Sequence, residues 1–172
     1  MASEAPSPAG TSGPRQIIIG GDGFGEGLKA AVADHLAKKG VAVKDVGTEK
    51  YYIAAAKVAK EVKTSGNTGI LFCGTGMGVS IIANKFEGVY AALCENEVAA
   101  ARARSINNAN VLALGGMVTP PEEAAKIVDT FLEQEFNKAP AVGDCEWWSP
   151  EIEQFLEASM GELAEIEHGS RS

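Results

Sequence analysis

The stretch CGTGMG places a thiol, Cys73, directly before three glycines at alternate positions. Gly74, Gly76 and Gly78 leave the backbone with little steric cover, so N–H groups of this loop can converge on a negatively charged oxygen. Such surroundings favour a thiolate over a thiol. The pattern predicts a cradle for an enolate or another oxyanion, with Cys73 as base or nucleophile. The alternative for Cys73 is a small, buried and inert side chain.

Other polar residues fall in further loops of the chain. Asp22 lies in GGDGFGEG, where its carboxylate either accepts a hydroxyl proton from a substrate or stabilises a turn. Thr75 places a hydroxyl beside Cys73. The SINNAN stretch offers uncharged hydrogen-bonding groups, although it also suits an ordinary loop: Asn107, Asn108 and Asn110.

Known nucleotide motifs fit these loops poorly. Gly21 and Gly23 match the first two positions of GxGxxG, but Glu26 occupies the third and would put a carboxylate beside a pyrophosphate. The run Gly25–Ala30 fits GxGxxA, yet it begins several residues too far from the preceding strand. The loop Gly74–Gly78 lacks the GK[ST] ending of a P-loop. We therefore expect no bound nucleotide cofactor.

The loops follow short apolar runs that alternate with segments of helical periodicity. Strands are predicted at Ile17–Ile19, in Val41–Gly47 with an end near Asp45, and at Gly69–Cys73, Val89–Cys94 and Val111–Gly116. Helices are predicted at Leu28–Lys39, Ala54–Lys63, Val79–Lys85, Glu97–Arg104 and Pro121–Gln134. This order predicts a doubly wound, three-layer α/β/α sandwich with a five-stranded parallel sheet. Ligands of such sheets bind beyond the carboxyl ends of the strands, and we expect the SINNAN loop to lie there as well.

The two ends of the chain differ from this body. Residues 1–15 are rich in Ser, Ala, Pro and Gly and predict a disordered leader before a domain at 16–136. Residues 137–168 read as a linker followed by a C-terminal helix that starts at Ser149-Pro150. Residues 169–172 are expected to form a loose tail.

The charge and composition of the chain indicate which kinds of binding partner are not expected. The formal net charge is −8 and no dense Lys/Arg run exists, so neither nucleic acid nor an anionic membrane is the expected partner. No apolar run is long enough to cross a bilayer. Three cysteines without metal-ligand spacing suggest free thiols in a reducing compartment, the cytoplasm or a plastid, and no metal site.

Three stretches together resemble the type B ribose-5-phosphate isomerase and galactose-6-phosphate isomerase family: GDGFG, CGTGMGVSIIANKFEGVYAALC and NNANVLALGG. The likeness runs from about Gln16 to Phe136. Tyr51-Tyr52, ARSINNANVLA and the tail SPEIEQFLEASMGELAEI are similar to a plant subgroup called DNA-damage-repair/toleration proteins.

The resemblance implies a Rossmann-like homodimer that interconverts an aldose phosphate and a ketose phosphate without metal or cofactor, as in the pentose phosphate pathway. Cys73 matches the base that moves a proton between C1 and C2 through a cis-enediolate, and Thr75 matches an assisting hydroxyl. Asp22 matches the aspartate of the first loop. The matching substrate-binding residues are Gly74, Gly76, Met77, Gly78, Asn107 and Tyr51. In the family the pocket lies between two subunits.

This chain also departs from the family pattern. Gly23 and Ile106 stand where the family usually has histidines, and Met117 and Tyr90 stand where arginines are usual. Arginine forks supply the bidentate bonds that grip a phosphate. The resemblance therefore implies either an isomerase with altered substrate preference or a non-catalytic sugar-binding or scaffold module.

Overall fold

The computed structural model describes residues 16–169 of the chain. Five parallel strands form one sheet in the order β2-β1-β3-β5-β4. The strands are β1 (Ile17–Gly21), β2 (Val43–Thr48), β3 (Thr68–Cys73), β4 (Ala91–Leu93) and β5 (Val111–Gly115). The helices are α1 (Glu26–Lys38), α2 (Tyr51–Ser65), α3 (Met77–Ala83), α4 (Glu97–Ser105), α5 (Pro121–Glu133) and α6 (Pro150–Gly169). The predicted α/β class and parallel five-stranded sheet are confirmed.

The strands differ in burial as their positions in the sheet require. Every residue of β1 and β5 is buried, and so are all residues of β3 after its first. A parallel strand with both faces covered is a continuous apolar run, which explains why these three strands are plain in the sequence. The edge strands β2 and β4 are only partly covered.

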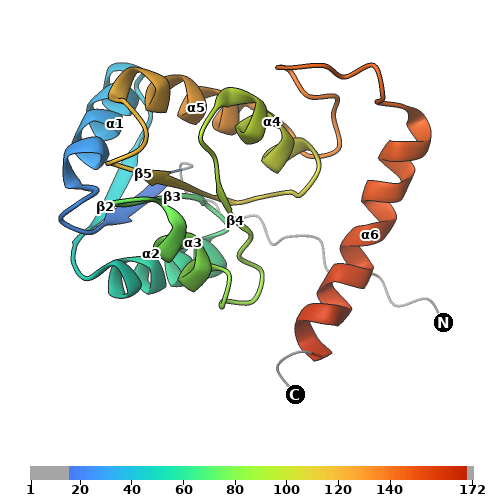
Figure 1. Ribbon diagram of the computed structural model, residues 1–172. Helices are drawn as coiled ribbons and strands as arrows, with labels where there is room; N and C mark the ends of the chain where they lie inside the picture. Colours follow the sequence, from blue (N-terminus) through green and yellow to red (C-terminus); the bar gives the residue numbers. More distant parts are fainter. Residues whose placement is uncertain (1–15, 170–172) are drawn as a thin grey trace.

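Helices cover both faces of the sheet (Figure 1). α1, α4 and α5 pack on one face over a cluster that includes Ile19, Phe72, Leu114 and Phe131. α2 and α3 pack on the other face over Leu71, Val79 and their neighbours. The three layers hold the strands rigidly, so the loops at the strand ends have fixed starting points.

The register of the strands brings three loops to one edge. In adjacent pairs, Gly21 lies opposite Phe72 and Cys73 lies opposite Gly115. The loops that follow β1, β3 and β5 therefore meet at the carboxyl edge. SINNAN does not join them, because it precedes β5 and Asn110 bonds to Gly69 at the start of β3. Our placement of SINNAN at the carboxyl edge was wrong: a loop that enters a parallel strand lies at its amino end.

Two element boundaries also differ from the predictions. β2 continues to Thr48, and α2 begins at Tyr51 rather than Ala54. Both wrong boundaries have a physical cause. β2 is a half-exposed edge strand with a polar end, and Lys50, the N-cap of α2, makes no capping hydrogen bond through its side chain. The usual sequence signal of a helix start is therefore missing.

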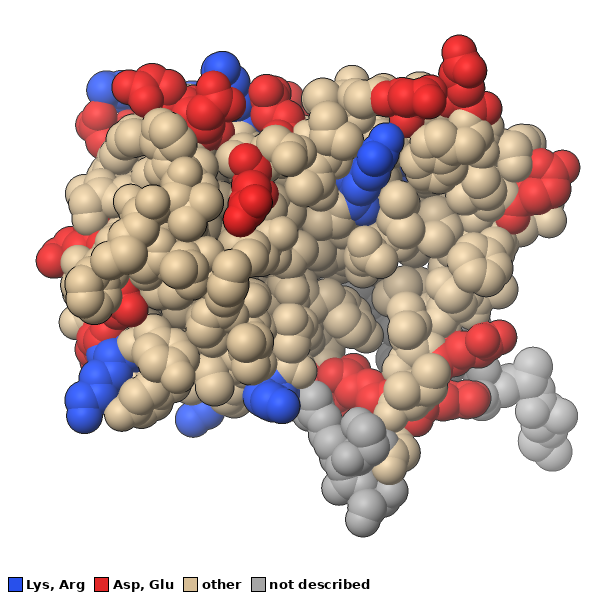
Figure 2. Space-filling view, in the orientation of Figure 1, with Lys and Arg blue, Asp and Glu red and all other residues tan. Residues whose placement is uncertain are grey.

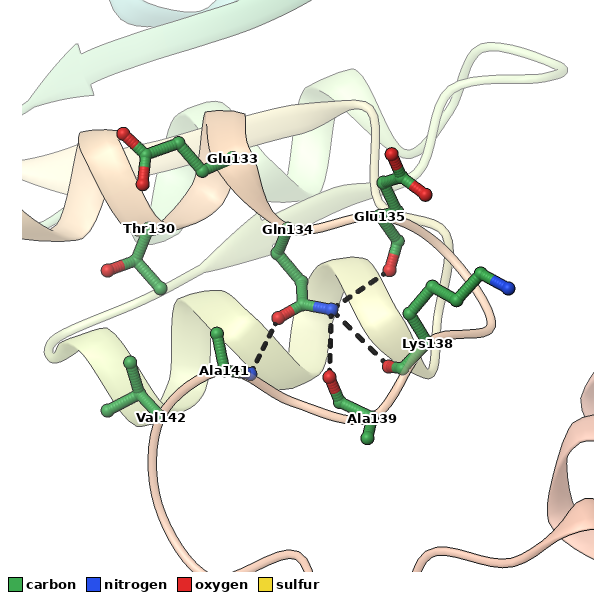
Figure 3. A pocket seen from close by; sticks show the side chains of 8 residues that line it. All are labelled: Thr130, Glu133, Gln134, Glu135, Lys138, Ala139, Ala141 and Val142. Atoms are coloured by element: carbon green, nitrogen blue, oxygen red, sulfur yellow. Dashed lines mark hydrogen bonds between the residues drawn. The ribbon is translucent and has the colours of Figure 1, made fainter.

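The linker after α5 is held by one buried side chain, Gln134 (Figure 3). Its Nε2 donates to the carbonyl oxygens of Glu135, Lys138 and Ala139, while Oε1 accepts from the N–H of Ala141 at 2.8 Å. The small pocket drawn there is thus a structural feature of the loop, with the polar atoms of Gln134 already used.

α6 stands to one side of the body (Figure 1) and Leu156 is its buried contact residue. A hollow between α6 and the body is visible in Figure 2 and is lined mostly by apolar groups, including Tyr90, Phe155 and Leu163. The helix continues to Gly169, one residue into the predicted tail. The predicted leader at 1–15 and the remaining tail lie outside the described residues. No helix in residues 16–169 has the length and apolar character needed to cross a membrane.

Candidate active site

Backbone hydrogen bonds tie the three loops at the carboxyl edge to one another. The N–H of Asp22 donates to the carbonyl of Phe72 at 3.0 Å. The N–H of Gly116 donates to the carbonyl of Cys73 at 2.8 Å, and that of Met117 donates to Gly74 at 2.9 Å. The residues around Cys73 are therefore fixed by main-chain contacts from both neighbouring strands.

Glycine permits the close approach of these loops. A Cβ atom on Gly25 would lie 2.5 Å from the carbonyl carbon of Phe72, and one on Gly115 would lie 2.6 Å from the carbonyl carbon of Thr75. Backbone atoms cannot yield at such distances. The glycines of the first and third loops therefore allow the CGTGMG backbone to sit directly on its neighbours, which the sequence alone did not reveal.

Cys73 is the last residue of β3 and only 5% of its surface is exposed. Its Sγ atom accepts a hydrogen bond from the N–H of Gly76 at 3.1 Å. A backbone amide is thus directed at the sulfur atom. The thiol thus lies at the end of β3, directly before the glycine loop, as the strand prediction implies.

Gly76 adopts a left-handed backbone conformation, with a φ of 78°. This conformation turns the chain back over Cys73 so that the N–H of Gly76 points at the sulfur. Among the described residues, the N–H groups of Gly74, Thr75 and Gly78 have no hydrogen-bond acceptor. They are available for an oxygen that carries negative charge, as an enediolate does.

A pocket of about 390 Å³ opens above Cys73. It is lined by residues from the three loops and from the start of α2: Asp22, Phe24, Tyr51, Cys73, Gly74, Thr75, Gly78 and Met117. None of these is a Lys, Arg or His, within the part of the chain that the structure describes. The pocket has one carboxylate, one thiol, two hydroxyls and an apolar rim.

Asp22 stabilises a turn, which is one of the two roles that the sequence left open, and it also lies at the pocket. Its Oδ1 accepts hydrogen bonds from the N–H groups of Phe24 at 2.9 Å and Gly25 at 3.0 Å, which makes an Asx turn. Its side chain also lines the pocket. The second carboxylate oxygen, Oδ2, has no hydrogen-bond partner in residues 16–169 and can accept a bond from a ligand.

Thr75 and Tyr51 line the pocket with hydroxyl-bearing side chains. Oγ1 of Thr75 accepts a weak bond from the N–H of Met77 at 3.4 Å. The ring of Tyr51 packs so closely on Gly78 that a Cβ there would lie 3.0 Å from two ring carbons. Because the predicted helix began at Ala54, the sequence placed Tyr51 in the preceding loop. In the structure Tyr51 is the first residue of α2.

Three expected binding residues are not among the pocket-lining residues: Gly76, Met77 and Asn107. The N–H of Gly76 is bonded to the sulfur of Cys73. Met77 is 51% exposed and contributes its backbone to the loop. Asn107 is exposed near the amino edge of the sheet, where it lines the hollow beside α6. Within one copy of the chain, Asn107 therefore does not lie with Cys73.

Two pocket residues were missed as site residues, Phe24 and Met117. They are 68% and 65% exposed, so the pocket has a large apolar rim. Phe24 lies in GGDGFGEG beside Asp22, and its place in a loop at the carboxyl edge is the sequence signal that would have identified it. The sequence comparison considered Met117 only as a position where the family usually has an arginine.

The other cysteines are not at the pocket. Burial raises the pKa of Cys94 to about 12, which keeps it a neutral thiol. Cys145 is exposed in the linker. Residues 16–169 contain no group of three or more His, Cys, Asp and Glu arranged to hold a metal ion.

Much of the face shown in Figure 2 carries neither acidic nor basic side chains, and acidic groups gather along its edges. Large exposed apolar side chains lie beside the pocket, in the same loops, at the start of α2 and in α3: Phe24, Tyr51, Met77, Ile81, Met117 and Val118. Exposed apolar side chains on this scale are typical of an interaction surface.

Comparison with known proteins identifies relatives across most of the chain. Residues 17–143 match the model of a family described as Ribose/Galactose Isomerase. DNA damage-repair/toleration protein DRT102 of Arabidopsis thaliana is 42% identical over 156 residues, which cover 89% of this chain and 50% of that protein. The chain thus spans half the length of this plant relative.

Two other similar proteins are of the same size as the chain. The 4-deoxy-4-sulfo-D-erythrose isomerase of a Clostridium species is 39% identical over 157 residues, covering 87% of this chain and 96% of that protein. The crystal structure of ribose-5-phosphate isomerase B from Mycoplasma genitalium, with bound ribulose-5-phosphate, superposes with a TM-score of 0.75 and 35% identity. It covers 89% of this chain and 96% of its own.

Proposed function

The chain belongs to the ribose/galactose isomerase family, and we propose that it interconverts an aldose and a ketose of a small sugar with a phosphate or sulfonate group. The Clostridium and Mycoplasma relatives are named isomerases, which supports the reaction type. The proposal for this chain is a proton transfer between C1 and C2 of the open-chain sugar, with Cys73 as the base.

The reaction follows from the groups at the pocket. The Cys73 thiolate removes the proton on C2 of the aldose, the C1–C2 double bond forms, and the C1 oxygen gains the negative charge. The N–H groups of Gly74, Thr75 and Gly78, which have no acceptor among the described residues, are the proposed donors to this oxygen. The proton returns to C1, the O2 proton moves to O1, and a ketose results. Thr75 and Asp22 are the proposed partners of the hydroxyl groups.

One observation carries the proposal: the buried Sγ of Cys73 accepts a hydrogen bond from the N–H of Gly76 at the base of the pocket. A structural cysteine does not need this contact. Cys94, by contrast, is buried and its pKa is raised by desolvation. The two thiols therefore differ in their surroundings: Cys73 accepts a backbone hydrogen bond and lines the pocket, whereas Cys94 does not line it.

We further propose that the active enzyme is a homodimer with the pocket at the subunit interface. The apolar rim at Phe24, Tyr51 and Met117 supports this, because a second copy would cover it. Asn107 lies outside the pocket of its own copy, so the partner subunit is the proposed route by which this amide reaches the sugar. The proposed compartment is reducing, the cytoplasm or a plastid, since all three cysteines are free.

A coupled assay of aldose-to-ketose conversion tests the function, with D-ribose 5-phosphate and D-erythrose 4-phosphate as substrates. Loss of a positioned base lowers rates by about 10² to 10⁴-fold, and we expect Cys73→Ala to show such a loss. Cys145→Ala, which removes an exposed thiol of the linker, is the matched control and retains full activity. Sugar-dependent thermal stabilisation without turnover in the wild type would instead identify a non-catalytic binding module.

A further inference from the structure

We infer, as a refinement that rests on the proposed function, that this isomerase accepts only the open-chain form of its sugar. Its preferred substrates are then aldoses that cannot cyclise. In these sugars the oxygen on C4 is absent or blocked, as in a tetrose that carries an anionic group at C4. The inference depends on which proton donors and acceptors the pocket contains.

Opening a furanose ring needs two proton transfers. A proton leaves the hydroxyl on C1 as the bond between C1 and the ring oxygen breaks, and the ring oxygen gains a proton. An enzyme that performs this step needs a base for the first proton and an acid for the second, ideally with pKa values near the working pH. A sugar that exists only as the open chain needs neither group.

The pocket supplies a base but lacks a suitable acid. The Oδ2 oxygen of Asp22 can accept a proton, but an ionised carboxylate has none to donate. Cys73 must be a thiolate in order to remove the C2 proton, so it has no proton to donate either. Thr75 and Tyr51 have hydroxyl groups, and alcohols and phenols are weak acids at neutral pH.

Neither of the two histidines in the sequence lies at the pocket. Nε2 of His35 is 2.8 Å from Oδ1 of Asp129, where it joins α1 to α5. Nδ1 of His168 is 3.0 Å from Glu87, near the end of α6. Both imidazoles are therefore engaged in contacts away from the three loops.

The hollow that Asn107 lines adds no suitable acid within the described residues of one copy. The hollow that Asn107 lines also contains Ile106, which is apolar, and Tyr90. Burial and the neighbouring Glu167 raise the pKa of Tyr90 above its ordinary value, so this phenol is a weaker acid than a free tyrosine. If a second copy presents this hollow to the pocket, as proposed above, Ile106 and Tyr90 bring no suitable acid with Asn107.

Three substrates separate ring opening from chain length. D-ribose 5-phosphate forms a furanose, its 4-deoxy analogue has five carbons but no ring oxygen, and D-erythrose 4-phosphate has its C4 oxygen esterified. The full chain and Cys73→Ala are compared on all three. Since acid–base catalysis contributes about 10² to 10⁴-fold, we expect kcat/KM for both acyclic sugars to exceed that for D-ribose 5-phosphate by about 100-fold or more.

A second readout distinguishes the mechanism. With D-ribose 5-phosphate the rate should stop rising at high enzyme concentration, because spontaneous ring opening becomes limiting, whereas the acyclic sugars show no such ceiling. Equal or better kcat/KM for D-ribose 5-phosphate overturns the inference. So does a 4-deoxy pentose that reacts as slowly as D-ribose 5-phosphate, which would indicate selection by length. Turnover of none of the three above the Cys73→Ala level contradicts the proposed function itself.

Discussion

The N–H of Gly76 donates a hydrogen bond to the Sγ of Cys73 at 3.1 Å, and the two residues are only three positions apart. This contact exists because Gly76 has a positive φ that folds the loop back over the strand end. A backbone amide thus holds the thiol at the pocket, where the proposed function requires the base. The position of the Cys73 sulfur therefore depends on the backbone conformation of Gly76.

Gly76→Ala should damage both the fold and the activity. Its Cβ would lie 2.5 Å from Cδ1 of Leu93 and 3.0 Å from the carbonyl carbon of Leu114, and the backbone conformation is strained for any residue with a side chain. Strain of this kind costs about 1 to 3 kcal/mol per residue. Chemical denaturation and the isomerase assay measure the two effects.

Gly161→Ala is the matched control for that variant. Gly161 lies within α6, with no atom within 4 Å of its would-be Cβ. Alanine in place of glycine in a helix interior stabilises by about 0.5 to 1 kcal/mol. A Gly76→Ala protein with wild-type stability and rate would show that the loop does not need this conformation.

Cys94 and Cys145 should differ sharply in reactivity. Alkylation of the native protein at pH 8 followed by mass spectrometry should modify the exposed Cys145 and spare Cys94, whose pKa is raised to about 12 by burial. Rapid labelling of Cys94 under native conditions would contradict its burial in the core.

The same thiol predicts a loss of stability at high pH. The unfolded chain releases the Cys94 proton near the ordinary pKa of 9.0, while the folded protein retains it to about 12. The contribution of Cys94 to the free energy of unfolding is therefore fully present below pH 9. It declines as the pH rises toward 12, by up to about 1.4 kcal/mol per pH unit. Denaturation of the wild type and Cys94→Ala at pH 8 and pH 10.5 should show the steeper decline in the wild type.

Asp129 should cause a loss of stability at low pH, in contrast to the loss at high pH expected from Cys94. Burial by itself would raise the pKa of Asp129, but hydrogen bonds from Lys39 and His35 outweigh it and lower the pKa below the ordinary 3.8. Its stabilising effect is thus present above about pH 4 and is lost as the pH falls through the depressed value. Acid titration should show a smaller loss for Asp129→Asn than for the wild type. Identical acid transitions in the two proteins would argue against a contribution of this cluster.

The proposed dimer can be tested at its apolar surface. Val118 is 47% exposed next to the pocket residue Met117, so Val118→Glu places a charge on the surface that the second copy is proposed to cover. We expect sedimentation to show a monomer with reduced activity. Lys60→Glu, at an exposed position of α2, is the control and should stay dimeric. A wild-type monomer with full activity would end the proposal that the interface completes the site.

The buried strands and the Cys73 loop could be predicted from the sequence because their physics is local. β1, β3 and β5 are apolar runs with both faces covered, and the alternating glycines after Cys73 describe an open backbone by themselves. The edge strand β2 and the start of α2 gave weaker signals, because one is half exposed and the other lacks a capping side chain.

The relative placement of loops could not be read from local patterns. SINNAN was assigned to the wrong edge because its composition suits a loop at either end of a strand, whereas the parallel register decides where it lies. The apolar rim formed by Phe24 and Met117 was equally hidden, since it appears only when the loops after β1 and β5 meet over the loop after β3.

The central claim is that Cys73 moves the C2 proton, and proton NMR in D₂O tests it most directly. D-erythrose 4-phosphate is incubated with the wild type, Cys73→Ala and Cys145→Ala, and the C2–H signal of the aldose is followed as the ketose forms. We expect the signal to disappear equally fast with the wild type and Cys145→Ala, and about 100-fold or more slowly with Cys73→Ala. Loss of the C2 proton at the wild-type rate with Cys73→Ala would contradict the account.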